Sequence, residues 1–184
     1  EQYQAVYHEH MLQMFSERPY LWSTFVWNMF DFAADAREEA GDNGVNHKGL
    51  VSFDRKVRKD AFYIYKAWWS KEPFVHVCGS RYVDRVEDET EIKVYSNQPK
   101  VALYVNGALV EEKEGEHIII FHIPNVGEQT ITAKAGELSD EIAIRKVDTP
   151  NPDYAFKEQT SVNNWFEEEG MEVHAPVPQS VSVN

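Results

Sequence analysis

The pattern of apolar and polar positions in the N-terminal part of the chain predicts a helix, a buried strand and a second helix. Residues 3–17 carry apolar side chains at helical spacing, and Pro19 ends this helix. Residues 20–32 are apolar almost throughout and rich in aromatic side chains, which is typical of a strand buried on both faces of a parallel sheet. A long polar loop follows over residues 35–49, and residues 59–69 form the second helix, with an aromatic face. The apolar positions that recur in the first helix are Val6, Tyr7, Met11, Met14 and Phe15.

The N-terminal segment thus contains one predicted strand between two predicted helices. Helix, strand and helix in succession is the order found in an α/β barrel or a doubly wound sheet. A single strand cannot close either kind of sheet, because its two apolar faces and its two edges need neighbours. Residues 1–72 are therefore expected to be incomplete by themselves.

After Pro73 the pattern changes to short alternating runs separated by turn residues. Asn106 and Gly107 lie between two such runs and are a strong signal for a type I′ hairpin turn. Seven short strands at this spacing predict an immunoglobulin-like β-sandwich over residues 73–147, followed by a linker and C-terminal extension over residues 148–184. The expected fold class is α/β plus all-β. The seven runs are residues 74–79, 91–96, 101–107, 108–113, 117–123, 128–136 and 141–147.

The composition excludes several classes of partner and site. The formal net charge of −13 would repel the phosphate groups of nucleic acids and anionic membrane surfaces, so neither is an expected partner. No apolar run approaches the ~20 residues of a membrane helix, and no signal peptide is recognised. Cys78 is the only cysteine, which excludes an internal disulfide and a Cys-based metal site. We expect no metal and no cofactor, and a periplasmic or secreted bacterial location is favoured over a cytoplasmic one.

Candidate functional residues lie in the stretch that follows the predicted strand. In α/β barrels the site lies at the C-terminal ends of the strands, which here means Trp27 through Lys48. Trp27 could stack on the face of a sugar, although composition alone favours packing in a core. Asp31 is expected either to be buried against a partner or to reach the barrel mouth. His8 and His10 are two residues apart on a helix, so they face different directions and cannot share a metal ion.

Several stretches of the chain resemble a known family. FVWNMFDF over residues 25–32 is similar to the eighth barrel strand of glycoside hydrolase family 2, and residues 46–70 are similar to the loop and helix that close that barrel. Residues 73–147 resemble the immunoglobulin-like module that follows the barrel in many galactosidase-like members. The resemblance implies that residues 1–72 are the C-terminal end of a catalytic (β/α)8 barrel, whose remainder is their partner.

The resemblance also implies a chemistry and a set of substrate contacts. Family 2 enzymes hydrolyse β-glycosides with retention, using two glutamates. Both glutamates are expected upstream of Glu1, so the chain has no catalytic residue and should be inactive alone. Trp27 matches the family tryptophan that packs against the sugar. Asn46 and Lys48 form an Asn-x-Lys pattern that binds the substrate carboxylate in the family's β-glucuronidases. The same pattern also fits a loop that folds back on the barrel mouth.

Three functions stay open on this evidence. The leading one is a retaining glycoside hydrolase that cleaves terminal β-galactosides, which the appended immunoglobulin-like module favours. The second is a β-glucuronidase, which Asn46 and Lys48 favour. The third is a non-catalytic carbohydrate-binding or interaction module, based on the sandwich alone. Against this third function, residues 73–147 lack an obvious row of exposed aromatic side chains.

Overall fold

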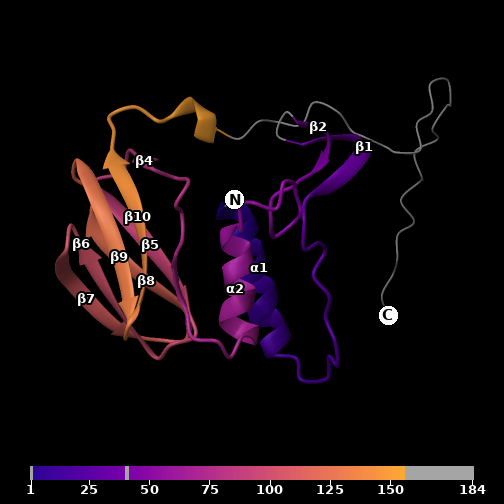
Figure 1. The fold of residues 1–184 in the computed structure, drawn as a ribbon, viewed down its shortest axis with the longest axis horizontal. Coiled ribbons are helices and arrows are strands. Elements are labelled where there is room, and N and C mark those ends of the chain that lie inside the picture. The colour runs from indigo at the N-terminus through magenta and orange to yellow at the C-terminus, as the bar shows by residue number, and fades with distance from the viewer. Residues whose placement is uncertain (1, 40–41, 156–184) are drawn as a thin grey trace, which may run out of the picture.

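A helix pair, a β-sandwich and a β-hairpin make up the described part of the chain (Figure 1). The structure is a computed structural model that describes residues 2–39 and 42–155. Helices α1 (Gln2–Ser16) and α2 (Asp60–Trp69) lie side by side, with the sandwich on one side and the hairpin on the other. Within the described ranges, neither helix is long and apolar enough to cross a membrane.

The two predicted helices are confirmed, and the most deeply buried residues of α1 are not the apolar ones that predicted it. α1 buries Ala5, His8 and Leu12, whereas Val6 and Tyr7 are more than half exposed. The buried positions are three and four residues apart and so form one helical stripe. Met11, Met14 and Phe15 are partly buried, so only Val6 and Tyr7 of the five apolar positions that predicted the helix are exposed. The buried residues of α2 are Asp60, Ala61, Ile64, Tyr65 and Ala67.

Residues 20–32, predicted as a buried strand, cross the molecule without joining a ladder until β1 begins at Phe32. Phe30 makes only an isolated parallel bridge with Val51. Trp22 is 94% exposed and Phe25 is 90% exposed. The apolar pattern signals burial, but the described residues supply no strand to pair with this segment and no layer to cover it. The prediction of a strand buried on both faces is therefore wrong for this chain by itself.

The polar stretch predicted as a loop over residues 35–49 instead contributes to a β-hairpin. Strand β1 (Phe32–Glu39) pairs antiparallel with β2 (Asp42–Asn46), with shifts of register along the pair. The stretch showed no strand signal because it lacks apolar alternation and has only one β-branched residue, Val45, of the kind that favours strands. The hairpin brings Asn46, at the end of β2, back beside Phe32, at the start of β1. The residues after β2 therefore lie beside the end of the extended segment.

Two sheets form the sandwich, and each of the seven predicted runs contains a strand. The strands are β3 (Val75–Val77), β4 (Asp84–Arg85), β5 (Glu89–Ser96), β6 (Lys100–Val105), β7 (Ala108–Glu114), β8 (His117–Pro124), β9 (Glu128–Ala135) and β10 (Leu138–Lys146), and a short helix η1 (Pro152–Tyr154) follows. One sheet has the order β3–β5–β8, and the other has the order β4–β10–β9–β6–β7. The short β4, which pairs parallel with β10, was not predicted. Asn106 and Gly107 both have positive φ, so the predicted type I′ turn between β6 and β7 is confirmed.

Apolar side chains fill the space between the two sheets, and a second apolar cluster joins the sandwich to the helices. Strand β5 serves both, because Ile92 and Val94 belong to the sandwich core while Tyr95 packs with α2. The ring of Trp68 on α2 stacks on His117 of β8 at a centroid distance of 4.0 Å. The helix pair, the three-stranded sheet and the five-stranded sheet therefore form successive layers.

Candidate functional site

Trp27 and Lys48, two of the three residues predicted to bind substrate, line the same open cleft. The cleft has a volume of about 950 Å³ and lies between the first two turns of α1, the hairpin and the loop after β2. Tyr3 and Tyr7 of α1 contribute aromatic side chains to its lining. Asn46, the third predicted residue, does not line the cleft. The structure thus gathers two of the predicted residues on one surface and sets the third behind it.

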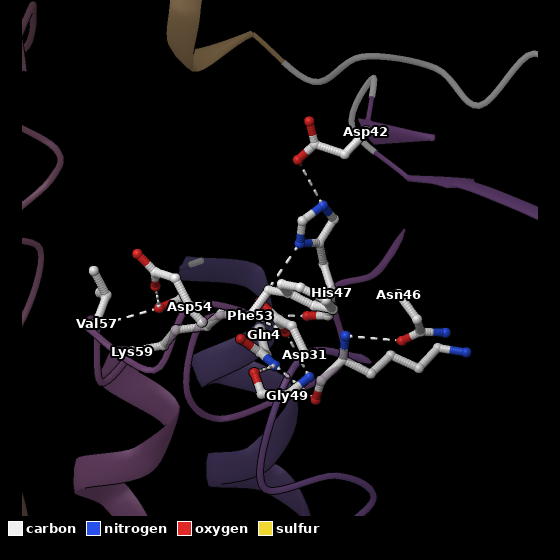
Figure 2. Close-up of polar contacts among 12 residues, drawn as sticks. Gln4, Asp31, Asp42, Asn46, His47, Gly49, Phe53, Asp54, Val57 and Lys59 are labelled. Carbon is white, nitrogen blue, oxygen red and sulfur yellow. Dashed lines mark hydrogen bonds and ion pairs between the residues drawn. The ribbon is translucent and has the colours of Figure 1, made fainter. Parts of the chain in front are cut away.

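A buried carboxylate, Asp31, organises the floor of this cleft (Figure 2). Its side chain is 3% exposed, and Oδ1 accepts hydrogen bonds from the Gly49 amide at 2.9 Å and the Lys59 ammonium at 2.7 Å. Lys59 also donates to the His47 carbonyl at 2.9 Å. A buried charge without a partner is strongly unfavourable, so each of the two charges depends on the other. The pair fastens the extended segment to the start of α2.

His47 extends this network to the hairpin. Its Nδ1 atom lies 3.5 Å from Asp31 Oδ2, and its Nε2 atom lies 3.0 Å from Asp42 Oδ2. Figure 2 shows the imidazole standing between these two carboxylates. The ring therefore connects the start of β2 to the floor of the cleft and fixes the loop that carries Lys48.

Gly49 allows this loop to approach the extended segment closely. A Cβ atom here would lie 2.0 Å from the Asp31 nitrogen and 2.1 Å from the Phe30 carbonyl carbon, so no side chain fits. Gln4 of α1 holds the loop from another side, donating from Nε2 to the carbonyls of Lys48 and Gly49 at 3.2 and 3.0 Å. The backbone around Lys48 is thus fixed while the residue itself is exposed.

Asn46 shapes the loop from inside. It is 2% exposed, and its Oδ1 accepts a hydrogen bond from the Lys48 amide at 3.0 Å. This closes a short side-chain turn of the kind that asparagine commonly forms with the backbone two residues ahead. Of the two interpretations of the Asn-x-Lys pattern, the loop that folds back describes the position of Asn46. The other interpretation, binding of a substrate carboxylate, requires an exposed cation, and Lys48 is exposed.

Trp27 is not part of the core of the described residues. It is 71% exposed, and its ring meets Phe32 edge to face at a centroid distance of 6.0 Å. The peptide bond between Trp27 and Asn28 is cis. An indole and a lysine ammonium on one cleft suit a ligand that has an apolar sugar face and an anionic group. Their roles in substrate binding stay predictions.

Sequence reasoning missed most of the network beneath this surface. Asp31 is buried against a partner, which is one of its two predicted fates, but nothing in the sequence identified Lys59 as that partner. The available signal was an acidic residue within an apolar run, since burial of such a residue requires a nearby cation. On α1, His8 is buried and His10 is exposed, so the prediction that they face different directions is confirmed.

Known proteins similar to this chain are glycosidases. A β-glucuronidase of Bacteroides fragilis is 40% identical over 159 residues, which cover 82% of this chain and 23% of that protein. An FMN-binding β-glucuronidase from Facaelibacterium prausnitzii L2-6 superposes with a TM-score of 0.79 and 46% identity, over 83% of this chain and 24% of that one. A putative β-galactosidase from Bacteroides fragilis superposes with a TM-score of 0.73 and 32% identity, over 79% and 23%. No family model matches the chain. The chain therefore spans about a quarter of the length of these relatives.

Proposed function

We propose that this chain, which is similar to β-glucuronidases and to a putative β-galactosidase, is the C-terminal part of a retaining hydrolase of glycoside hydrolase family 2 that cleaves β-glucuronides. The observation that carries the proposal is the exposed Lys48 beside Trp27 on one cleft. A glucuronide differs from a galactoside by its carboxylate, and a lysine ammonium is a suitable donor to that group. The β-glucuronidases among the relatives support the same choice.

The exposed aromatic segment supports a barrel as the setting of this site. Trp22, Phe25 and Trp27 are each more than two-thirds exposed, and Tyr3 and Tyr7 extend the same apolar character onto α1. Soluble proteins rarely leave several large aromatic side chains of one short segment uncovered unless that segment has a partner. We infer that this partner is the remainder of a (β/α)8 barrel, which belongs to the part of the longer protein that this chain does not span. The two glutamates of the retaining mechanism belong to that part.

A second candidate function is hydrolysis of β-galactosides. The likeness to the putative β-galactosidase and the sandwich that follows the second helix favour it. A galactoside has no carboxylate, so its binding gains no charge-assisted hydrogen bond from Lys48. The two candidates therefore differ in how strongly activity depends on this residue.

Kinetics of the complete enzyme on the two nitrophenyl substrates test the proposal. We expect a higher kcat/KM on the β-glucuronide than on the β-galactoside. Lys48→Met should cost about 2–4 kcal/mol of transition-state stabilisation on the glucuronide and little on the galactoside. The matched control is Lys71→Met, since Lys71 is exposed and does not line the cleft. A higher kcat/KM on the galactoside, with no effect of Lys48→Met, would replace the first candidate with the second.

Trp27→Ala in the complete enzyme tests the sugar-packing role. It should lower kcat/KM by an amount equivalent to about 2–4 kcal/mol of transition-state stabilisation, because a contact in the cleavage subsite is lost. Trp27→Phe keeps an aromatic face and should lose less, and both variants should keep the circular dichroism spectrum of the parent. Unchanged kinetics in Trp27→Ala would remove this residue from the substrate site.

The isolated chain should have no glycosidase activity. Retaining hydrolysis needs two carboxyl groups about 5–5.5 Å apart across the sugar, and the proposal places both outside this chain. Incubation of the 184-residue chain with either nitrophenyl substrate should release no more product than a buffer blank. Saturable turnover by the pure chain would contradict this assignment.

A further inference from the structure

Asp60, His76 and Cys78 meet at the seam between α2 and the sandwich. Asp60 opens α2, His76 lies in β3, and Cys78 follows β3 directly. Alternate residues on an extended backbone point to the same face, so His76 and Cys78 both turn toward the helix. Their ligand atoms, one from each residue, all lie within 4.8 Å of one another. A carboxylate, an imidazole and a thiol are thus brought together from two layers of the fold.

Neighbouring groups hold the imidazole and the carboxylate in one orientation. His76 Nε2 lies 3.0 Å from Asp60 Oδ1, and His76 Nδ1 lies 3.0 Å from Asp140 Oδ2. Tyr63 stacks on the imidazole at a centroid distance of 3.6 Å. The other oxygen of Asp60 accepts a hydrogen bond from the Gly79 amide at 3.0 Å. A histidine whose second nitrogen faces a carboxylate is the usual arrangement around a metal-bound imidazole.

The cluster opens onto a cavity that gives access to it. Asp60 and Cys78 line a cavity of about 400 Å³, together with Arg85, Lys93 and Tyr95. The two cations on this wall have partners of their own. Lys93 lies 3.0 Å from Glu9 Oε1, and Arg85 donates to the hydroxyl of Thr90 and to nearby carbonyls. The cavity therefore offers an entry path and room for a further ligand on the open side of the cluster.

We propose that Asp60, His76 and Cys78 form a site for a transition-metal dication of the zinc class, with a water molecule or a small ligand completing the coordination from the cavity. Mixed oxygen, nitrogen and sulfur ligands are typical of Zn²⁺, which prefers four ligands in tetrahedral geometry. The cation replaces the proton of His76 Nε2 and that of the Cys78 thiol. Burial and the nearby Asp60 carboxylate raise the pKa of this thiol, and a bound dication supplies the charge that offsets both effects.

No metal-binding motif in the sequence indicates this site. The single cysteine led us to expect no Cys-based metal site, and this proposal departs from that expectation because one thiolate can join ligands of other types. Asp60 is sixteen residues before His76 in the sequence. The cavity beside Cys78 is separate from the cleft that Trp27 and Lys48 line, since the two have no lining residue in common. The metal site therefore stands or falls independently of the proposed hydrolase function.

The test is an anaerobic titration of the intact chain with Co²⁺ alone. We expect saturation at one equivalent and a thiolate-to-cobalt charge-transfer band in the near ultraviolet, which Zn²⁺ abolishes by displacement. Cys78→Ser is nearly isosteric and should lose the band. Asp140→Asn keeps all three ligands but removes the carboxylate behind His76, and it should weaken cobalt affinity about 10–100-fold.

The matched control is His122→Gln, because His122 is exposed on the far strand β8 and should not affect the titration. Circular dichroism checks that each variant is folded. Three results would overturn the proposal: no binding by the folded wild-type chain, binding without the band, or a band that survives Cys78→Ser. Any of them would leave Asp60, His76 and Asp140 as an ion-paired contact between α2 and the sandwich.

Discussion

At the scale of single residues, the buried pair of Asp31 and Lys59 is the most consequential contact beneath the cleft. Both side chains are less than a tenth exposed, so Lys59→Met should leave the Asp31 carboxylate buried without its cation. We expect a loss of about 3–5 kcal/mol in the free energy of unfolding. Urea denaturation of the chain, followed by tryptophan fluorescence, measures the loss, because four of the five tryptophans lie in the N-terminal segment.

Lys56→Met is the control for this variant. The Lys56 side chain is 81% exposed and lies 3.4 Å from Asp54, so its removal should change the unfolding free energy by no more than about 0.5 kcal/mol. Equal effects of the two substitutions would mean that the buried pair does not stabilise this half of the molecule.

How much of the site the sequence could predict depends on the kind of contact. Trp27 and Lys48 could be named as candidates because their residue types and spacing resemble a family pattern, and both line one cleft in the structure. The position of Asn46 behind the surface could not be predicted, because its hydrogen bond to the Lys48 amide depends on the local turn. Gly49 was not singled out either, since its need to lack a side chain arises from contact with Phe30 and Asp31, which precede it by many residues. Contacts between distant segments depend on tertiary structure that no local pattern encodes.

At the scale of elements, the contact between α1 and α2 should be sensitive to acid. His8 lies buried in this contact, with Nδ1 2.9 Å from the Tyr65 hydroxyl, and burial lowers its pKa below the ordinary value of 6.5. Burial also raises the pKa of Tyr65 to about 12, so this phenol stays neutral at any relevant pH. The unfolded chain therefore binds a proton at His8 more readily than the folded chain does.

The sign of the effect follows from this difference. The stability that neutral His8 contributes is present above about pH 6.5 and is lost as the pH falls through the lowered pKa in the folded state. The melting temperature of the chain should fall between about pH 7 and pH 5, and His8→Gln should make this fall shallower. His10→Gln, at an exposed position of the same helix, should leave the slope unchanged. A slope that is identical in all three proteins would exclude His8 as its source.

The extended segment before β1 should control assembly with the rest of the longer protein. Trp22 and Phe25 are almost fully exposed in this chain. Trp22→Ser together with Phe25→Ser should therefore raise the solubility of the isolated chain, since exposed apolar segments promote aggregation. In the complete enzyme the same two changes should reduce the yield of folded protein. Light scattering measures aggregation of the chain, and size-exclusion chromatography measures the yield of the folded enzyme. A higher yield of the enzyme variant, together with a more soluble chain, would argue against a barrel partner.

Elements were predictable wherever local pattern and burial agree. The two helices and six of the seven strand runs were found because each buries part of its surface within this chain, as in β5, where Ile92 and Val94 alternate with more exposed residues. The remaining run contains β7, which has no buried residue, and it was found from the Asn106–Gly107 turn that precedes it. The hairpin β1–β2 was missed because most of its residues are polar or alanine and carry no periodic signal. The segment over residues 20–32 was misassigned for the opposite reason, since its apolar pattern is strong but its neighbours are not among the described residues.

At the scale of the whole molecule, the sandwich and the helix pair depend on each other unequally. The sandwich has a core of its own between two sheets, whereas the helices bury their second face against strand β5 and its neighbours. The seam between them includes Tyr95, which is fully buried, and the stacked pair of Trp68 and His117. Separating the two parts at the seam should therefore lower the stability of both, but only the sandwich retains a closed core.

We expect residues 73–147 to fold alone and residues 1–72 not to. A domain of this size is small but can be stable, at the low end of the usual ~5–15 kcal/mol. Without α2, Tyr95 becomes exposed, so the excised sandwich should melt cooperatively at a lower temperature than the sandwich within the whole chain. A polypeptide of residues 59–147 restores α2 over Tyr95 and should recover part of the difference. Residues 1–72 keep the uncovered segment around Trp22 and should precipitate or unfold without a sharp transition. Calorimetry of the whole chain and the three fragments measures this order, and a monomeric, cooperatively melting form of residues 1–72 would overturn the claim that this segment needs a larger barrel.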